Sequence, residues 1–314
     1  MERRDEAAIA FFGSWMVTGL YLDGWSHIHQ RPETFFTPWH AVLYSGFAVA
    51  CVYFIGRGIV SGRRLELDRV TNAGFVLFLV AAFGDFGWHM LFGIERSLAA
   101  LLSPTHLALM TGGLMMLSGP IRDAHGRTIE RFSDFFPTLV CCTLITTVVM
   151  FFLQYLNAFT LVGMFGTRDE AFKVYVVSAV LVTNAVLMGV AFFMRRNWRI
   201  PPGAFTFMFA VVALSGAGLE SFRARHIITA IVGGATADYL ADRSDGAFGV
   251  GVPLVTWSTW VAVTAVFGTA AWSPNIWLGA IFLATLSGLG LSVLVARPVT
   301  TTTATPPAEV RDRP

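Results

Sequence analysis

Two short stretches near the start of the chain repeat one arrangement of Asp and His residues. In each, an Asp precedes a His by four residues at the end of an apolar run, and a second His follows at the start of the next run. Ionisable side chains are rare in such apolar segments unless they have a function. The first copy is Asp23, His27 and His40, and the second is Asp85, His89 and His106.

The spacing of these residues is typical of a metal site. Residues four apart on a helix point to the same side, so each Asp and the His after it present a carboxylate and an imidazole from one face. Thr37 and Ser103 are typical N-caps, each followed by a Pro that suits the first helical position, which puts His40 and His106 in the first turn of the next helix. Two His and one carboxylate are a ligand set for copper, zinc or non-haem iron. Whether the two sets form one centre or two stays open.

Simpler interpretations of the same residues exist. Asp and His four apart can form an ion pair or a step of a proton path. His29 and Glu95 lie beside the motifs and are candidates for residues that assist the metal ligands, for example by orienting an imidazole through a hydrogen bond. The alternative for His29 is a solvated residue, and the alternative for Glu95 is a surface ion pair.

The composition defines the class of protein. Of 314 residues, 55% are hydrophobic, 13% are charged and 28 are Phe, which is more apolar surface than a soluble core of this size needs. The basic residues are spread over short loops and form no patch suited to nucleic acid, so a nucleic-acid partner is not expected. The lipid bilayer is the expected partner of a polytopic membrane protein, and the 3 Cys, all in apolar runs, are expected to be packing residues.

The fold predicted is an all-α bundle of about eight to ten transmembrane helices, each about twenty residues long. Residues 1–297 form the membrane domain, in which 1–132 hold the two related metal hairpins (spans one and two, then three and four) and 133–297 add further helices. Residues 298–314, rich in Thr and Pro, are expected to be a disordered tail. The segment 226–240 is apolar but short, and it is expected either to lie at the membrane interface or to re-enter the membrane. The predicted spans are 7–27, 39–61, 70–92, 103–121, 135–160, 172–194, 202–222, 248–271 and 275–296.

The basic residues also predict the orientation. Lys and Arg gather before the first span and in the loops after the second, fourth and sixth spans, whereas the loops between them carry one basic residue each. By the positive-inside rule, the N-terminus is cytoplasmic and both metal motifs lie near the external face.

The first motif, DGWSHIHQRPETFFTPWHAVLYSGF, closely resembles the ligand segment of the C subunit of copper membrane monooxygenases, the particulate methane and ammonia monooxygenases. In that family an Asp, a His four residues on and a His thirteen residues later bind copper, and these positions correspond to Asp23, His27 and His40. The second motif, GDFGWHMLFGIERSLAALLSPTH, is similar to the family's other copper site, although the family generally has Asn in place of Asp85 and a shorter gap between the histidines. The resemblance covers about residues 15–120.

The resemblance implies a copper-binding, oxygen-activating subunit in a bacterial-type plasma membrane, acting on a small hydrophobic substrate. The family works with a subunit that has cupredoxin-like domains, and no β-rich domain fits into this chain. Either companion membrane or cupredoxin-like subunits supply it, or this protein uses the metal hairpins alone, and a homo-oligomer is a further option. Iron and zinc stay open as alternatives to copper. Two other functions compete: a non-catalytic protein that handles or delivers copper, and a proton- or ion-coupled transporter that uses Asp23 and Asp85. The few charges in the later spans argue against the transporter.

Overall fold

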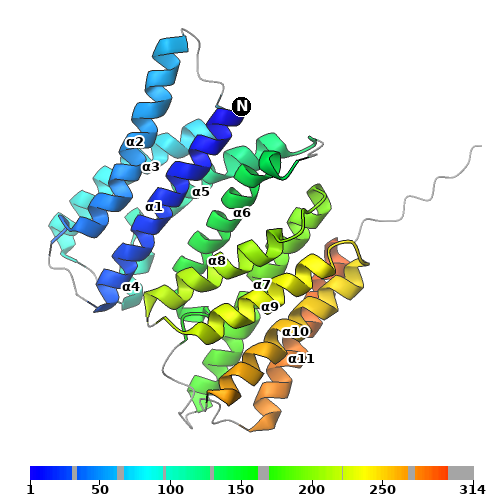
Figure 1. The fold of residues 1–314 in the computed structure, drawn as a ribbon. Helices are drawn as coiled ribbons and strands as arrows, with labels where there is room; N and C mark the ends of the chain where they lie inside the picture. The colour runs from blue at the N-terminus through cyan, green and yellow to red at the C-terminus, as the bar shows by residue number, and fades with distance from the viewer. Residues whose placement is uncertain are drawn as a thin grey trace, which may run out of the picture.

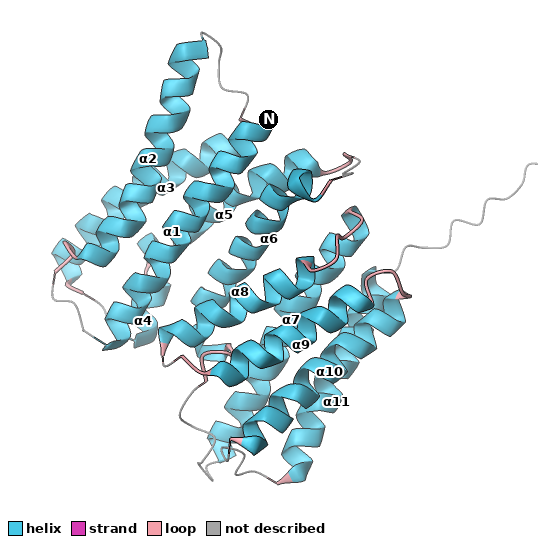
Figure 2. Ribbon diagram, viewed as in Figure 1, coloured by secondary structure: helices cyan, strands magenta, loops and turns pink. Residues whose placement is uncertain are grey.

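The structure, a computed structural model, describes residues 1–29, 34–61, 67–94, 97–127, 131–161, 170–220, 222–267 and 273–295. Within these residues all secondary structure is helical, which confirms the predicted all-α class (Figures 1 and 2). The elements are α1 (Arg3–His29), α2 (Pro38–Ser61), α3 (Arg69–Phe92), α4 (Ser97–Leu102), α5 (Pro104–Ala124), α6 (Phe132–Phe152), the 3-10 turn η1 (Gln154–Leu156), α7 (Glu170–Asn197), α8 (Ala204–Leu219), α9 (Ala224–Tyr239), α10 (Asp245–Val266) and α11 (Pro274–Val295).

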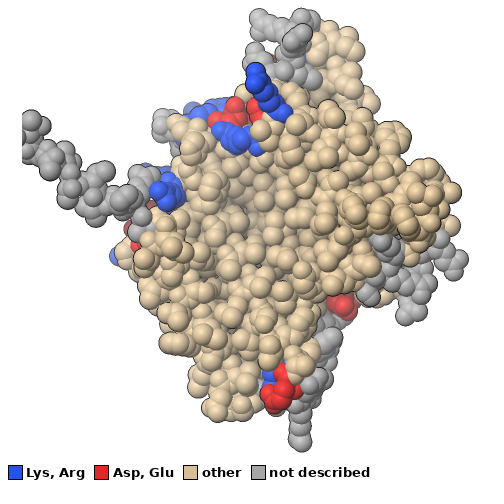
Figure 3. Space-filling view, turned by 180° about the vertical axis from the view of Figure 1, so that it is seen from behind, with Lys and Arg blue, Asp and Glu red and all other residues tan. Residues whose placement is uncertain are grey.

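Six of the described helices, α2, α3, α6, α7, α10 and α11, are long and apolar enough to cross a membrane. Helix α8 is apolar but shorter, with 16 residues, while α1 and α5, with 27 and 21 residues, are long enough but less apolar. On the face shown in Figure 3, charged side chains gather toward the ends of the molecule and leave an uncharged band between them. The chain is therefore a multi-pass membrane protein.

Each of the nine predicted spans corresponds to one helix, but the fifth, 135–160, is predicted too long, because α6 ends at Phe152. Local side-chain bonds to the backbone compete with the helix there. The Asn157 side chain accepts a hydrogen bond from the Phe159 amide (2.9 Å), and the Thr160 hydroxyl donates to the Gln154 carbonyl (2.8 Å). The segment 226–240 lies in α9 up to its last residue, Leu240, which caps the helix, and α9 packs between α8 and α10. The predicted tail, 298–314, lies outside the described residues.

Two helical hairpins form the part of the bundle that holds the motifs. Helix α1 packs along α2, α3 packs along α5, and α6 contacts both α1 and α5 (Figure 1). Helices α3 and α5 approach very closely at Gly74 and Gly112: a Cβ atom added at Gly112 would lie 2.8 Å from the backbone nitrogen of Phe78. Small residues at such contacts let transmembrane helices pack backbone to backbone. This contact fixes α3 against α5 within the second hairpin.

Ion pairs join these helices at the end opposite the motifs. The Asp68 carboxylate caps α3 by accepting the backbone N–H groups of Val70 and Thr71, and it pairs with Arg122 of α5 at 2.8 Å. Partial burial would raise the pKa of Asp68, but the hydrogen bonds from Thr71 and Arg122 outweigh it and lower that pKa to about 2. Two further pairs tie the start of α1 to α2 and α5: Asp5 with Arg57 (3.2 Å), and Glu6 with Arg127 (2.7 Å).

The glycine contact makes a first prediction. Gly112→Ala should lower the free energy of unfolding by about 1–3 kcal/mol, the usual cost of overpacking, because the new methyl group meets the α3 backbone. The neighbouring Gly113→Ala is the matched control, since its Cβ would meet only the Phe78 ring edge at 4.0 Å. Thermal unfolding followed by circular dichroism in detergent tests this, and equal stability of the two variants would contradict the close contact.

The Asp68 cap makes a second prediction. The pKa of the Asp68 carboxyl is lowered from 3.8, its value in the unfolded chain, to about 2 in the folded protein. The charge of Asp68 therefore stabilises the fold fully at a pH above 3.8, and this stabilisation is lost as the pH falls through about 2. Asp68→Asn keeps a capping side chain but loses the charge. The variant should therefore be less stable than the native protein at neutral pH, and the difference should shrink as the pH falls from 3.8 to about 2 in thermal unfolding. A difference that is independent of pH would contradict this account.

Candidate metal centre

The first hairpin brings its three predicted ligands together. Asp23 and His27 lie one turn apart near the end of α1, and α2 begins at Pro38 after Thr37, whose hydroxyl accepts the His40 backbone N–H at 3.2 Å. The predicted N-cap is thereby confirmed. One Asp23 oxygen lies 3.6 Å from Nε2 of His27 and 3.5 Å from Nε2 of His40.

The second hairpin repeats this construction. Ser103 caps α5 and accepts the His106 backbone N–H at 3.2 Å, again as predicted. One Asp85 oxygen lies 3.5 Å from Nε2 of His89 and 3.1 Å from Nε2 of His106. The longer loop of this hairpin contains the short helix α4, and the Ala100 carbonyl of α4 accepts a hydrogen bond from Nδ1 of His106.

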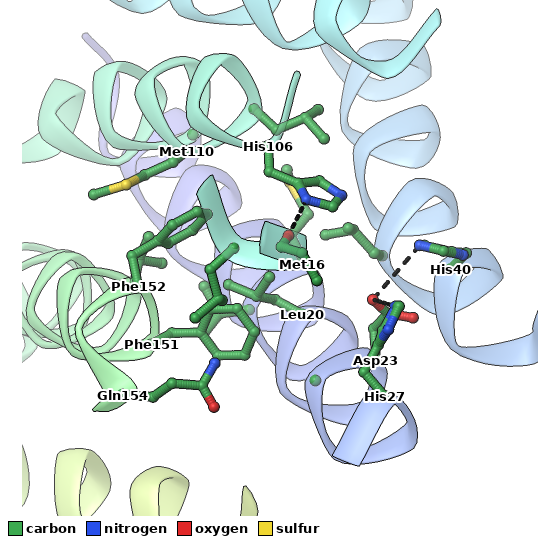
Figure 4. Close-up of a pocket in the computed structure, with 18 of the residues that line it drawn as sticks. Met16, Leu20, Asp23, His27, His40, His106, Met110, Phe151, Phe152 and Gln154 are labelled. Carbon is green, nitrogen blue, oxygen red and sulfur yellow. Dashed lines mark hydrogen bonds and ion pairs between the residues drawn. The ribbon is translucent and has the colours of Figure 1, made fainter. Parts of the chain in front are cut away.

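The two sets of ligands lie side by side. Asp23, His27 and His40 have ligand atoms within 4.8 Å of one another, and so do His40, Asp85 and His89. His40 therefore belongs to both groups, and its ring centre lies 6.2 Å from that of His89. His106, the third predicted ligand of the second set, belongs to neither group and contacts the second one through Asp85. Figure 4 shows Asp23 between His27 and His40, with His106 across the cavity on α5. We refer to Asp23, His27, His40, Asp85, His89 and His106 together as the six-residue cluster.

Backbone carbonyls orient three of the four imidazoles. Nδ1 of His40 lies 2.8 Å from the Phe35 carbonyl oxygen, and Nδ1 of His89 lies 3.2 Å from that of Gly93. His106 makes the same bond to Ala100. A carbonyl can only accept, so each Nδ1 carries the hydrogen. In the neutral ring Nε2 is then an unprotonated acceptor, and all three Nε2 atoms face a carboxylate oxygen.

This arrangement fits a cation. An Nε2 lone pair that faces a carboxylate lone pair is repelled unless a proton or a metal ion lies between them. Among the described residues, Nε2 of His89 and Oδ1 of Asp23 are buried without a hydrogen-bond partner, although buried polar atoms are normally satisfied. Asp85 is 0% exposed, His40 4% and His89 6%, so water does not screen the cluster well.

Two side chains that the sequence analysis missed hold the Asp85 carboxylate. The Tyr44 hydroxyl donates to one oxygen at 2.7 Å, and the Thr105 hydroxyl donates to the other at 3.1 Å. Tyr44 lies four residues after His40 and so shares its helix face, which was an available signal. Outer hydrogen bonds of this kind fix the direction of a ligand.

Of the two residues predicted to assist the ligands, His29 lies in the described part of the chain and Glu95 does not. Both ring nitrogens of His29 lie near backbone carbonyls: Nδ1 is 2.9 Å from that of Trp25, and Nε2 is 3.0 Å from that of Glu220. The described bonds of His29 therefore tie α1 to the end of α8, away from the ligand imidazoles. Glu95 lies outside the described residues.

An apolar cavity of about 810 Å³ opens at the cluster. Its wall includes Asp23, His27, His40, Asp85 and His106, and its remaining surface is mainly aliphatic and aromatic. Figure 4 shows Met16, Leu20, Met110, Phe151 and Phe152 beside the polar residues. An apolar compartment therefore adjoins the candidate metal centre.

Comparisons with models of protein families, with curated proteins and with solved structures found no match to this chain. The resemblance to the copper monooxygenase C subunit thus rests on the two motifs.

The shared position of His40 makes a third prediction. His40→Ala should remove bound metal from the whole cluster, because both three-residue groups use this side chain, whereas His27→Ala should spare the group of His40, Asp85 and His89. Elemental analysis of purified protein measures the metal content of each variant. His29→Ala is the matched control and should keep all the metal, since its described ring contacts are backbone carbonyls. Full metal retention in His40→Ala and in His89→Ala would refute the centre.

Proposed function

We propose that this protein binds copper in the membrane and acts as an oxygen-activating, monooxygenase-like subunit on a hydrophobic substrate. The observation that carries the proposal is that three imidazole Nε2 atoms, those of His40, His89 and His106, face the buried carboxylate of Asp85 or the half-buried carboxylate of Asp23. Imidazole and carboxylate ligands suit copper, iron and zinc, and copper binds most tightly of the divalent first-row metals. When bound, copper supplies the one-electron chemistry that oxygen activation needs.

The ligand types favour oxidised copper. Thiolate and thioether ligands select cuprous ions. Cys141 and Cys142 are buried in the interior of α6, and Cys51 lies on α2 about three turns beyond His40, so no cysteine thiolate belongs to the groups found among the described residues. Imidazole and carboxylate ligands would suit cupric copper, and this supports redox chemistry over transport of cuprous ions.

The chain's own residues supply positioning and a dry environment. Tyr44 and Thr105 hold the Asp85 carboxylate, and the backbone bonds hold the imidazoles, so the ligands need little rearrangement. The apolar cavity beside them excludes water and gives a hydrophobic substrate a route from the bilayer.

The topology and partners form part of the proposal. The ion-paired ends of α1 and α5 face the cytoplasm, which places the cluster near the external side of a bacterial-type plasma membrane. Electrons come from a donor outside this chain, and companion membrane or cupredoxin-like subunits are the candidates; a homo-oligomer is also compatible. Iron and zinc are the alternative metals.

Copper handling is the second candidate function. His27 and His106 are still 17% and 18% exposed in their side chains, so a metal carrier could reach the cluster from outside. A handling protein needs neither a reductant nor a deep apolar cavity, and the cavity therefore favours catalysis.

Oxygen uptake separates the two candidates and is the fourth prediction. Purified copper-loaded protein in lipid nanodiscs, given a quinol and a hydrophobic substrate, should consume oxygen in proportion to the substrate oxidised, and His40→Ala should not. His29→Ala serves as the control and should keep the activity. Copper that passes to an external chelator with no substrate-dependent oxygen uptake would instead establish handling. If companion subunits are needed, the same assay on native membranes, with and without His40→Ala, carries the test.

A further inference from the structure

The apolar cavity is long and follows one face of α1. Its wall on that helix includes residues at spacings of three and four from Ile9 to Ile28. From Ile9 to His27 the helix rises by about 27 Å, close to the thickness of a bilayer's hydrocarbon core. The cavity therefore extends from the six-residue cluster nearly to the ion-paired end of the hairpins.

Polarity divides this cavity into two parts. The described polar side chains of its wall lie at the cluster end, where Tyr44, Gln154 and Glu220 accompany the ligands. The wall deeper in the bundle consists of apolar residues from α1, α2, α3 and α5. They include Ile9, Phe12, Phe54, Phe75, Gly113 and Leu117.

The cavity is elongated. A sphere of about 810 Å³ would be about 12 Å across, whereas the wall follows α1 for about 27 Å. An elongated apolar cavity matches the shape of an extended aliphatic chain better than that of a compact ring system. The volume itself lies within the usual range for ligand sites.

The opening lies at the polar end. Among the residues of the wall, Leu98 is 46% exposed, Ile28 38% and Tyr155 37%, and all three are near the cluster. At the other end, Ile9 is 3% exposed and Phe54 4%, so the cavity is closed there. A chain must therefore enter tail first and leave its polar end beside the cluster.

We propose that the cavity binds one long unbranched aliphatic chain, with its tail between Ile9 and Phe54 and its polar end at the six-residue cluster. This inference rests on the proposed function and names its substrate class: a single-chain amphiphile such as a long-chain fatty acid or fatty alcohol. The apolar depth holds the tail, and the polar end places the first carbons of the chain beside the candidate metal centre.

A larger side chain at Gly113 would block the cavity and so tests the proposal. It lies in the cavity wall about 10 Å along α5 from His106, and a Cβ atom there would meet only the Phe78 ring edge, at 4.0 Å. The Gly113→Leu side chain should thus fill the cavity at mid-depth and leave the residues of the six-residue cluster in place. Gly189→Leu on α7 is the matched control, because the added Cβ has nothing within 4 Å and the residue is not in the cavity wall.

Photolabelling tests the proposal without relying on activity. Purified full-length protein is incubated with two palmitic acid analogues, one with a diazirine near the carboxylate and one with a diazirine at the tail, and labelled residues are mapped by mass spectrometry. The first should label Tyr44 and Met110, and the second should label Phe12 and Phe54. Gly113→Leu should reduce the labelling by both analogues by about tenfold or more, the factor set by about 1.4 kcal/mol of overpacking, because both must place their tails past residue 113.

The outcomes separate this proposal from the proposed function. Labelling confined to lipid-facing residues such as Val52 and Val76, or deep labelling that Gly113→Leu and Gly189→Leu affect equally, overturns the chain site even if copper is bound. Deep labelling by a phospholipid with the same acyl group, but not by the free acid, also overturns it. The expected labelling in protein that binds no copper supports the chain site and removes the proposed function. Circular dichroism and metal content check that Gly113→Leu is folded.

Discussion

The hydrogen bonds from imidazole Nδ1 to backbone carbonyls are the constraint on which the candidate centre depends. A carbonyl inside a helix already accepts a helical N–H, so carbonyls with free lone pairs occur mainly at helix ends and in loops. Phe35 precedes α2, Gly93 follows α3 and Ala100 belongs to the single short turn of α4. The need for such acceptors explains why the ligands sit at the ends of long helices.

Close packing elsewhere keeps these helix ends in register. Lipid gives helices no hydrophobic reason to associate, so contacts between small residues and polar bonds must hold them. Gly74 and Gly112 bring α3 onto α5, and the pairs of Asp5 with Arg57 and of Glu6 with Arg127 anchor α1 at the far end. The six-residue cluster is thus fixed from a distance by the packing of the helices and locally by its own hydrogen bonds.

The sequence predicted the local parts of this centre well and the tertiary parts poorly. Caps at Thr37 and Ser103, and the spacing of Asp23 to His27, follow from helix geometry over a few residues. The sharing of His40 between the two groups depends on how two hairpins pack, and no local pattern encodes that. The length of a membrane span predicts a fifth helix that continues past Phe152, because several of the residues after it are apolar. Side chains in that segment bond the backbone instead, and α6 ends at Phe152.

Charge balance links the centre to its proposed metal. Two carboxylates, Asp23 and Asp85, lie in a largely buried cluster, and burying charges without compensation is costly. Tyr44 and Thr105 donate to Asp85 but bring no positive charge. Protons on the carboxyl groups or imidazoles, or one divalent cation, must therefore balance the site, and on the imidazoles the proton and the cation compete for the same Nε2 positions. Protonated imidazoles would lie next to one another, as His40 and His89 do at 6.2 Å, and would repel, whereas a single ion satisfies several ligands at once.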